Sequence, residues 1–172
     1  MIGFDTGTAN TLLDAWYLRQ HPTSKTRFDR DGLFAKKGDI HEALLKELLS
    51  DPYFQLPFPK STGREYFSLE WLLSKIGKAI IKAEDVQRTL IELTTYSISD
   101  AIKSLPLSNF QVIACGGGMH NQLLLQSLGN KLEMKDGELK LEFNFGPKPL
   151  PAKPEKPAKP AAPEKKPAEP KK

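Results

Sequence analysis

The spacing of apolar residues predicts a chain made mostly of helices, with short strands between them. Apolar side chains recur at helical intervals over residues 9–21, 40–49, 69–73, 84–105 and 119–130. Asp39 and Ser68 precede two of these stretches and are expected to cap them. Apolar runs predict the end of a buried strand at residues 2–5 and a strand at residues 110–115. Residues 51–67 contain three prolines and a glycine, which predicts a loop.

Two segments after residue 130 differ from this helical body. In "KLEMKDGELKLEFNF", apolar and polar residues alternate after a Lys-Asp-Gly turn signal, which predicts a β-hairpin over residues 131–146. Residues 147–172 contain nine of the 14 prolines and no aromatic or β-branched residue, so we expect a disordered Pro/Lys-rich tail. The sequence therefore predicts an α/β domain rich in helix over residues 1–130, followed by the hairpin and the tail.

Charge and composition limit the classes of partner. The tail has eight lysines and three glutamates, a net charge of +5, whereas the whole chain carries +4, so residues 1–146 carry −1. A body without a basic excess gives no support to nucleic-acid binding. No apolar run reaches the roughly 20 residues that span a bilayer, no signal peptide is visible, and Cys115 is the single cysteine. We expect a cytoplasmic protein that binds neither nucleic acid nor a membrane.

The opening "GFDTGTANTLL" places Asp5 between an expected strand and an expected helix. At the carboxyl end of a strand, a carboxylate faces the edge where α/β sheets bind ligands. Gly7 permits a sharp turn that brings backbone N–H groups near an anion, and the following helix start adds the positive end of its dipole. Asp5 could then hold Mg²⁺ or accept a proton from an attacking hydroxyl or water. The simpler alternative is that it only caps the helix.

A second candidate site lies in "VIACGGGMHN", between an expected strand and an expected helix. Gly116, Gly117 and Gly118 let an adenine ring or a phosphate approach the backbone without meeting a Cβ atom. Asn121 is expected one turn into the helix, where its amide could bind a ribose or a base. The alternative is a flexible turn without a ligand.

A third candidate is the loop "PKSTGREYF". Lys60, Ser61 and Arg64 place cations and a hydroxyl together, and such a set can hold an anionic sugar or a phosphate. Loops of this composition are more often simple solvated turns.

A D-T-G turn occurs in aspartic proteases and in phosphoryl-transfer enzymes. Proteases of the retroviral kind are nearly all β and form one site from two chains. Here the residues after the turn have helical spacing. That pattern favours phosphoryl transfer and leaves the protease as the weaker alternative.

Taken in order, five segments resemble the second half of the anhydro-N-acetylmuramic acid kinase family: "GFDTGTANTLLDAW", "DPYF", "PKSTGREYF", "DVQRTLIELTTYSI" and "VIACGGGMHNQLLL". The resemblance covers residues 2 to about 128. It implies part of the ribonuclease H-like fold of the sugar kinase/Hsp70/actin ATPase superfamily. Members of the family use ATP to phosphorylate 1,6-anhydro-N-acetylmuramic acid while water opens the anhydro ring. The product is N-acetylmuramate 6-phosphate, a step in the recycling of bacterial cell wall.

The resemblance also implies roles for the candidate residues. Asp5 would be the general base that deprotonates the attacking water, and Thr6 and Gly7 would belong to a phosphate-binding turn. The triple glycine and Asn121 match the family's adenosine segment. ATP with Mg²⁺ is then the expected cofactor and the anhydro sugar the expected substrate, and a homodimer is compatible with this assignment.

Three departures from the family pattern affect what we expect of the chain. The glycine-rich G-T-S-x-D-G loop of the family's first domain has no counterpart, Thr8 stands where the family has proline, and the hairpin and tail replace the family's acidic closing segment. We therefore expect a truncated or fused piece of the kinase, with little or no activity alone. A non-catalytic nucleotide- or partner-binding module is the alternative from another functional class.

Overall fold

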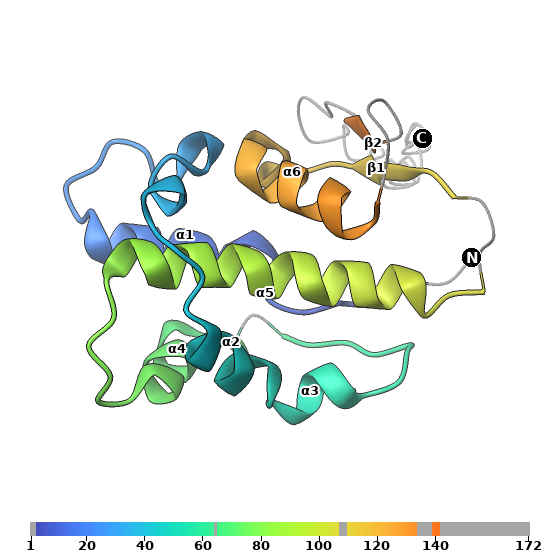
Figure 1. The fold of residues 1–172 in the computed structure, drawn as a ribbon, viewed down its shortest axis with the longest axis horizontal. Helices are drawn as coiled ribbons and strands as arrows, with labels where there is room; N and C mark the ends of the chain where they lie inside the picture. The colour runs from blue at the N-terminus through green and yellow to red at the C-terminus, as the bar shows by residue number, and fades with distance from the viewer. Residues whose placement is uncertain (1–2, 64, 107–109, 134–138, 142–172) are drawn as a thin grey trace, which may run out of the picture.

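The computed structural model describes residues 3–63, 65–106, 110–133 and 139–141 (Figure 1). Its elements, in chain order, are α1 (Ala9–Gln20), the 3₁₀ turns η1 (Arg30–Gly32) and η2 (Ala35–Lys37), α2 (Glu42–Leu49), α3 (Pro52–Gln55), α4 (Leu69–Ile76), α5 (Ala83–Lys103), β1 (Val112–Ala114), the 3₁₀ turn η3 (Gly117–His120), α6 (Gln122–Lys131) and β2 (Leu139–Leu141). The described residues are therefore rich in helix with little strand, as the sequence predicts.

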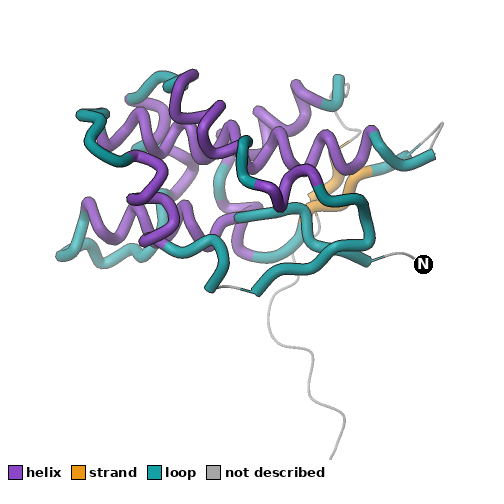
Figure 2. Tube along the Cα trace, turned by 90° about the horizontal axis from the view of Figure 1, so that it is seen from below, coloured by secondary structure: helices purple, strands orange, loops and turns teal. Residues whose placement is uncertain are grey.

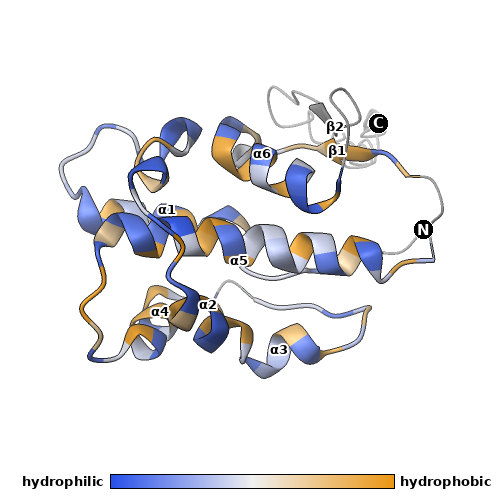
Figure 3. Cartoon of the chain, in the orientation of Figure 1, coloured by the Kyte–Doolittle hydropathy of each residue, from blue (hydrophilic) through white to orange (hydrophobic). Residues whose placement is uncertain are grey.

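Helix α5 is the centre of the fold. It has 21 residues and packs against α1, α2, η2 and α6. In Figure 1, α6 lies along one side of α5, and α2, α3 and α4 lie along the other. The buried core between these helices is made largely of aliphatic side chains, among them Leu12, Leu44, Leu48, Leu72, Leu90, Ile91 and Leu93. Figure 3 shows apolar and polar residues alternating along α5 and α6, as expected for helices that bury one face.

The helix starts confirm one predicted cap and correct another. Ser68 caps α4 as predicted, because its side chain accepts the backbone N–H of Trp71 at 3.2 Å. The Asp39 cap is wrong: α2 begins two residues later than that cap implies, and the side chain of His41 accepts the N–H of Leu44 at 3.1 Å. The backbone N–H of Asp39 instead donates to α5.

The predicted loop over residues 51–67 contains a short helix, α3. Asp51 caps it by accepting the N–H of Tyr53 at 3.0 Å, and Pro52 occupies the first helical position. Proline is favoured there because its fixed φ suits a helix and its missing N–H needs no partner. The three prolines led to the prediction of a loop, although one of them, Pro52, is the first residue of a helix.

The strands differ most from expectation. β1 pairs with β2 in parallel, with Val112 opposite Leu139. Figure 2 shows the two strands side by side at one end of a largely helical molecule. The predicted hairpin over residues 131–146 is not confirmed, because Lys131 ends α6, residues 132–133 form a turn and the one described strand pairs with β1. Residues 134–138 and 142–146 lie outside the described residues. The tail expected over residues 147–172 also lies outside them.

The predicted strand end at residues 2–5 is wrong for its described part, Gly3 to Asp5. No strand is assigned there, and Asp5 is exposed rather than buried. A strand needs a ladder of partners, whereas the N–H of Asp5 donates to Lys60 O in the loop after α3. Within the described residues, no helix is long and apolar enough to cross a membrane.

Candidate functional site

The D-T-G turn is fixed by contacts with α5. Gly7 has φ +153°, and a Cβ atom there would lie 3.0 Å from the ring of Phe54 and 3.4 Å from Ser97 Oγ, so both the backbone conformation and the tight packing favour glycine. The hydroxyl of Thr8 lies 3.1 Å from that of Thr94 on α5. The side chain of Thr8 is thereby engaged with α5 and does not cap α1. The backbone of the turn is therefore closely constrained.

The carboxylate of Asp5 is held by the loop after α3. Its Oδ2 accepts the hydroxyl of Ser61 at 2.8 Å and the backbone N–H of Thr62 at 3.0 Å. The Thr62 N–H, and then the Ser61 hydroxyl, lower the pKa of Asp5 below its ordinary 3.8, against a small opposing effect of burial. Asp5 is therefore an ionised, exposed carboxylate with a fixed orientation at neutral pH.

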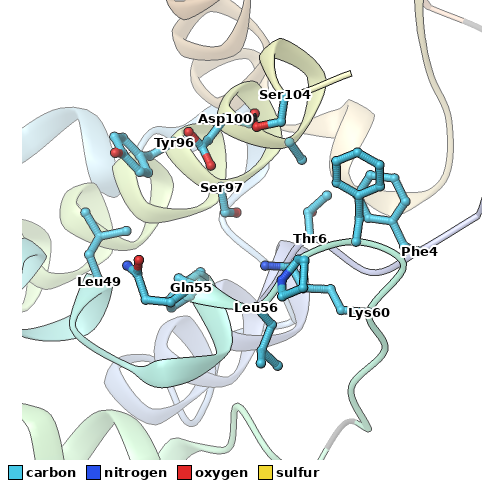
Figure 4. A pocket seen from close by; sticks show the side chains of 14 residues that line it. Phe4, Thr6, Leu49, Gln55, Leu56, Lys60, Tyr96, Ser97, Asp100 and Ser104 are labelled. Carbon is cyan, nitrogen blue, oxygen red and sulfur yellow. Dashed lines mark hydrogen bonds between the residues drawn. The ribbon is translucent and has the colours of Figure 1, made fainter. Parts of the chain in front are cut away.

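The structure brings together two of the three motifs that the sequence predicts as sites. Ser61 contacts Asp5 directly, whereas the Lys60 side chain turns away and donates to Tyr53 O at 3.0 Å. Arg64 lies outside the described residues. Thr6 and Lys60 line one wall of a pocket of about 410 Å³, which Ser97 and other α5 residues close from the opposite side (Figure 4).

The triple glycine lies against the first turn of α1. Gly116 has φ +83°, which explains glycine at that position. A Cβ atom at Gly117 would lie 3.5 Å from Asn10 Nδ2, and one at Gly118 would lie 3.6 Å from the Leu124 side chain. These are ordinary contact distances, so internal packing does not require glycine at positions 117 and 118.

The sequence predicts that Asn121 lies one turn into the helix, and this prediction is wrong. Asn121 is the N-cap of α6, where Oδ1 accepts the N–H of Leu124 at 3.0 Å. It also lines a pocket of about 90 Å³ with Asp14, Gly117 and Gly118. Burial raises the pKa of Asp14, an effect that a hydrogen bond from Asn10 partly offsets.

The D-T-G turn and the glycine bend lie at the same end of α1 but line different pockets. Asp5 and Gly7 line a pocket of about 120 Å³ that also includes Thr8, whereas the glycines line the pocket that includes Asn10. The first turn of α1 thus separates them: the pocket that Asp5 lines contains none of the three glycines, and the pocket that Gly117 and Gly118 line does not contain Asp5.

The sequence analysis missed a polar cluster behind Asp5. Asp51 is 6% exposed, and it accepts the hydroxyl of Tyr66 and the indole N–H of Trp71, each at 2.9 Å. The hydroxyl of Tyr53 donates to Asp5 O at 2.9 Å. The sequence does contain a local signal for the position of Asp51. Asp51-Pro52 combines a residue favoured as an N-cap with the residue favoured at the first helical position, which indicates a helix start.

Comparisons with a family model and with curated proteins identify the same family. The family model described as anhydro-N-acetylmuramic acid kinase matches residues 1–147, farther than the five segments that carried the sequence resemblance. A protein named anhydro-N-acetylmuramic acid kinase from Xanthomonas oryzae pv. oryzae is 51% identical over 132 residues, which are 77% of this chain and 34% of that protein.

Two further proteins of that name are similar. The one from Idiomarina loihiensis is 49% identical over 128 residues, 74% of this chain and 34% of its own length. The one from Colwellia psychrerythraea is 41% identical over 147 residues, 79% of this chain and 37% of its own length. The chain thus spans about a third of the length of these curated relatives. With the family model matching most of its residues, the chain belongs to the anhydro-N-acetylmuramic acid kinase family.

Proposed function

We propose that this chain carries the general base and part of the nucleotide site of a kinase that phosphorylates 1,6-anhydro-N-acetylmuramic acid with ATP. The single observation that carries the proposal is how Asp5 is held. An exposed carboxylate projects from a glycine turn before α1, with two donors on one of its oxygens. Among the described residues both donors bind Oδ2, which leaves Oδ1 for a water molecule.

The chemistry follows from this arrangement. Asp5 takes a proton from a water molecule as the water oxygen attacks the anomeric carbon. The bond from that carbon to the 6-oxygen breaks, and the 6-oxygen takes the γ-phosphoryl group of ATP, which leaves as ADP. The low pKa keeps Asp5 unprotonated at neutral pH, so it is always ready to accept the proton, although it is a weak base.

The nucleotide is proposed to lie along the glycine bend. Because packing leaves room for a Cβ atom at Gly117 and Gly118, a close ligand is a reason for glycine there. The start of α1 lies between this bend and Asp5, and the side chain of its N-cap residue, Thr8, leaves the first-turn N–H groups uncapped. Such a helix start favours phosphate groups. Asn121 contributes by fixing the start of α6 beside the bend.

ATP would bring Mg²⁺, which keeps water ligands and usually takes one or two carboxylates plus phosphate oxygens. No group of three or more His, Cys, Asp or Glu is placed to hold a metal in the described part of the chain. In the glycine pocket, Asp29 is bound to the N–H groups of Phe34 and Ala35, so Asp14 is the carboxylate that could serve. This donor set fits a metal held chiefly by the nucleotide, which would neutralise phosphate charge.

The sugar is proposed to bind on the Asp5 side of α1, near the loop that contains Ser61. From the sequence, we proposed Lys60, Ser61 and Arg64 as residues that bind the sugar. Lys60 and Ser61 are described in the structure, whereas the role of Arg64 rests on the sequence alone. The cytoplasmic location and the homodimer remain predictions. A helix-rich fold gives the protease alternative no support.

A kinase assay tests the proposal. The 172-residue chain is incubated with ATP and the anhydro sugar, alone and with the separately expressed first domain of a relative, and sugar 6-phosphate is measured by mass spectrometry. We expect little product from the chain alone, product with the added domain, and none with Asp5→Asn. Asp39→Asn is the matched control, because Asp39 is exposed and lines neither turn.

Three outcomes would contradict parts of this scheme. Product formation by Asp5→Asn at the unsubstituted rate would refute the role of Asp5. Robust product from the chain alone would refute its dependence on a first domain. ATP binding without product in any combination would favour the non-catalytic module.

A further inference from the structure

Three backbone carbonyls around Asp5 are joined in a closed ring of hydrogen bonds. The N–H of Asp5 donates to Lys60 O at 2.9 Å. The ammonium group of Lys60 donates to Tyr53 O at 3.0 Å. The hydroxyl of Tyr53 donates to Asp5 O at 2.9 Å and completes the ring. Each of the three residues gives one hydrogen bond and accepts one, although they come from three separate places in the sequence.

The ring holds both backbone groups of Asp5, its N–H and its carbonyl. The two donors to its carboxylate, Ser61 and Thr62, directly follow Lys60 in the chain. The same loop therefore positions the backbone and the carboxylate of Asp5. A displacement of this loop relative to Asp5 would break the backbone bond and both carboxylate bonds together.

The aromatic cluster around Tyr53 keeps its hydroxyl in place. Tyr53 is 4% exposed, and its ring packs edge-on against Phe54 and Phe67, with centroid distances of 6.0 Å and 5.2 Å. The Lys60 ammonium lies 4.8 Å from the centroid of the Tyr53 ring, a cation–π contact that fixes the lysine as well. These contacts leave the Tyr53 side chain little freedom to turn away from Asp5.

We propose that the ring of Asp5, Tyr53 and Lys60 is a clamp that orients the general base, which makes Tyr53 and Lys60 positioning residues for the reaction. The proposal rests on the proposed function in one respect, the role of Asp5. It assigns Lys60 a task other than binding the sugar. Positioning of this kind is effective because small errors in the placement of a reacting group are costly: a displacement of about 1 Å can slow a reaction roughly 100-fold.

The test begins with Asp5 itself and needs no enzymatic activity. The Asp5 carboxyl group is titrated by carbon-detected NMR in the 172-residue chain, and amide hydrogen exchange is measured at Asp5 and Thr62. Tyr53→Phe removes one hydroxyl and keeps the aromatic packing. Without the bond from Tyr53 to its carbonyl, Asp5 is held less firmly against Ser61 and Thr62. We therefore expect the pKa of Asp5 to rise toward 3.8 in this variant and both amides to exchange faster. Among the described residues, the titratable hydroxyl of Tyr53 is bonded to the Asp5 carbonyl, whereas Lys60 contacts Asp5 through its backbone carbonyl and its ammonium lies on Tyr53.

Two matched variants separate the clamp from general effects on the fold. Tyr17→Phe removes the same group from a ring that packs on His21 and Phe34. Tyr66→Phe removes a hydroxyl from the same cluster, but that hydroxyl binds Asp51 rather than Asp5. We expect neither to change the titration of Asp5. If Tyr53→Phe leaves the titration and exchange unchanged, or if Tyr66→Phe changes them equally, the clamp is refuted.

Activity then decides whether the clamp serves the reaction. With the first domain supplied, Tyr53→Phe is expected to lower kcat about tenfold with KM for the sugar little changed, as for an interaction that places the base. An altered titration with unchanged kcat would refute the positioning role. If Asp5→Asn abolishes product but Tyr53→Phe leaves the titration unchanged, the proposed function survives and the clamp fails. If the titration shifts but no combination yields product, the proposed function fails.

Discussion

Replacing Asp51 should measure how much the polar cluster behind the site contributes to stability. Its Oδ1 accepts the N–H of Tyr53 at 3.0 Å and the hydroxyl of Tyr66 at 2.9 Å, and its Oδ2 accepts the indole N–H of Trp71 at 2.9 Å. Asp51→Asn keeps the shape but replaces one acceptor oxygen with an NH₂ group. With the amide oxygen facing Tyr53 and Tyr66, its NH₂ group meets the indole N–H, so two donors face each other.

The expected cost follows from these contacts. A part-buried donor left without an acceptor costs about 1–3 kcal/mol, so Asp51→Asn should lower the free energy of unfolding by that amount at neutral pH. Asp51→Ala should cost about 2–5 kcal/mol, because the donors of Tyr53 and Trp71 both lose their acceptor. Tyr66 is 44% exposed, so its hydroxyl can bind water instead. Urea unfolding followed by far-UV circular dichroism measures both, and an unchanged m-value shows that the substitution altered stability and not the surface exposed on unfolding.

The pH dependence separates charge from shape. Burial raises the pKa of Asp51, but hydrogen bonds from Trp71, Tyr53 and Tyr66, with the charge of Lys75, lower it to a net value below 3.8. A carboxyl group with a lowered folded-state pKa contributes stability above its unfolded pKa and loses it as the pH falls through the folded value. The stability difference between the unsubstituted chain and Asp51→Asn should be constant near neutral pH and shrink below pH 3.8. Equal stabilities at neutral pH, or a difference that grows on acidification, would refute this reasoning.

Four other predictions concern the core and the glycines. Leu72 is fully buried, so Leu72→Ala should lower the unfolding free energy by about 2–5 kcal/mol in urea titrations. Gly38→Ala should lower Tm, because its Cβ would lie 2.3 Å from the carbonyl carbon of Glu84, whereas Gly117→Ala should leave Tm unchanged and weaken ATP binding in calorimetry. Gln87 is fully buried and its Oε1 has no partner among the described residues, so Gln87→Met should be neutral or stabilising, and a loss above about 1 kcal/mol would contradict this.

The helices were predictable because their signal is local. The periodic apolar residues of α1 and α5 gave both helices to within two residues at each end, and Ser68 was recognised from its position before an apolar run. The same spacing predicts Val86, Leu90, Leu93, Ser97 and Ala101 as the core face of α5, and all of these are buried except Ala101, which is half-buried. Each of these features depends on residues within a few turns of one another.

Pairings between distant segments were not predictable in this way. The alternating residues after Gly137 indicated a strand whose partner was the other arm of a hairpin, whereas β2 pairs in parallel with β1. Asp5 and Ser61 were identified separately as candidate residues, yet no local pattern indicated that they touch across 56 positions. Asn121 was predicted to lie inside a helix starting at residue 119, but η3 covers Gly117–His120 and Asn121 is the N-cap of α6.

The buried polar residues of α5 link the folded core to the candidate site. Thr94 is 1% exposed, and its hydroxyl donates to Leu90 O and to Ala9 O and lies beside that of Thr8. Ser97, one turn later, lies under Gly7, where a larger side chain would displace the turn. The helical period predicts that Ser97 lies on the core face but does not explain why the residue there is small. The close approach of Gly7 explains it. Because α1, α2 and α6 also pack on α5, we expect a change that shifts α5 to shift the D-T-G turn with it. Stability and the geometry at Asp5 are therefore not independent in this chain.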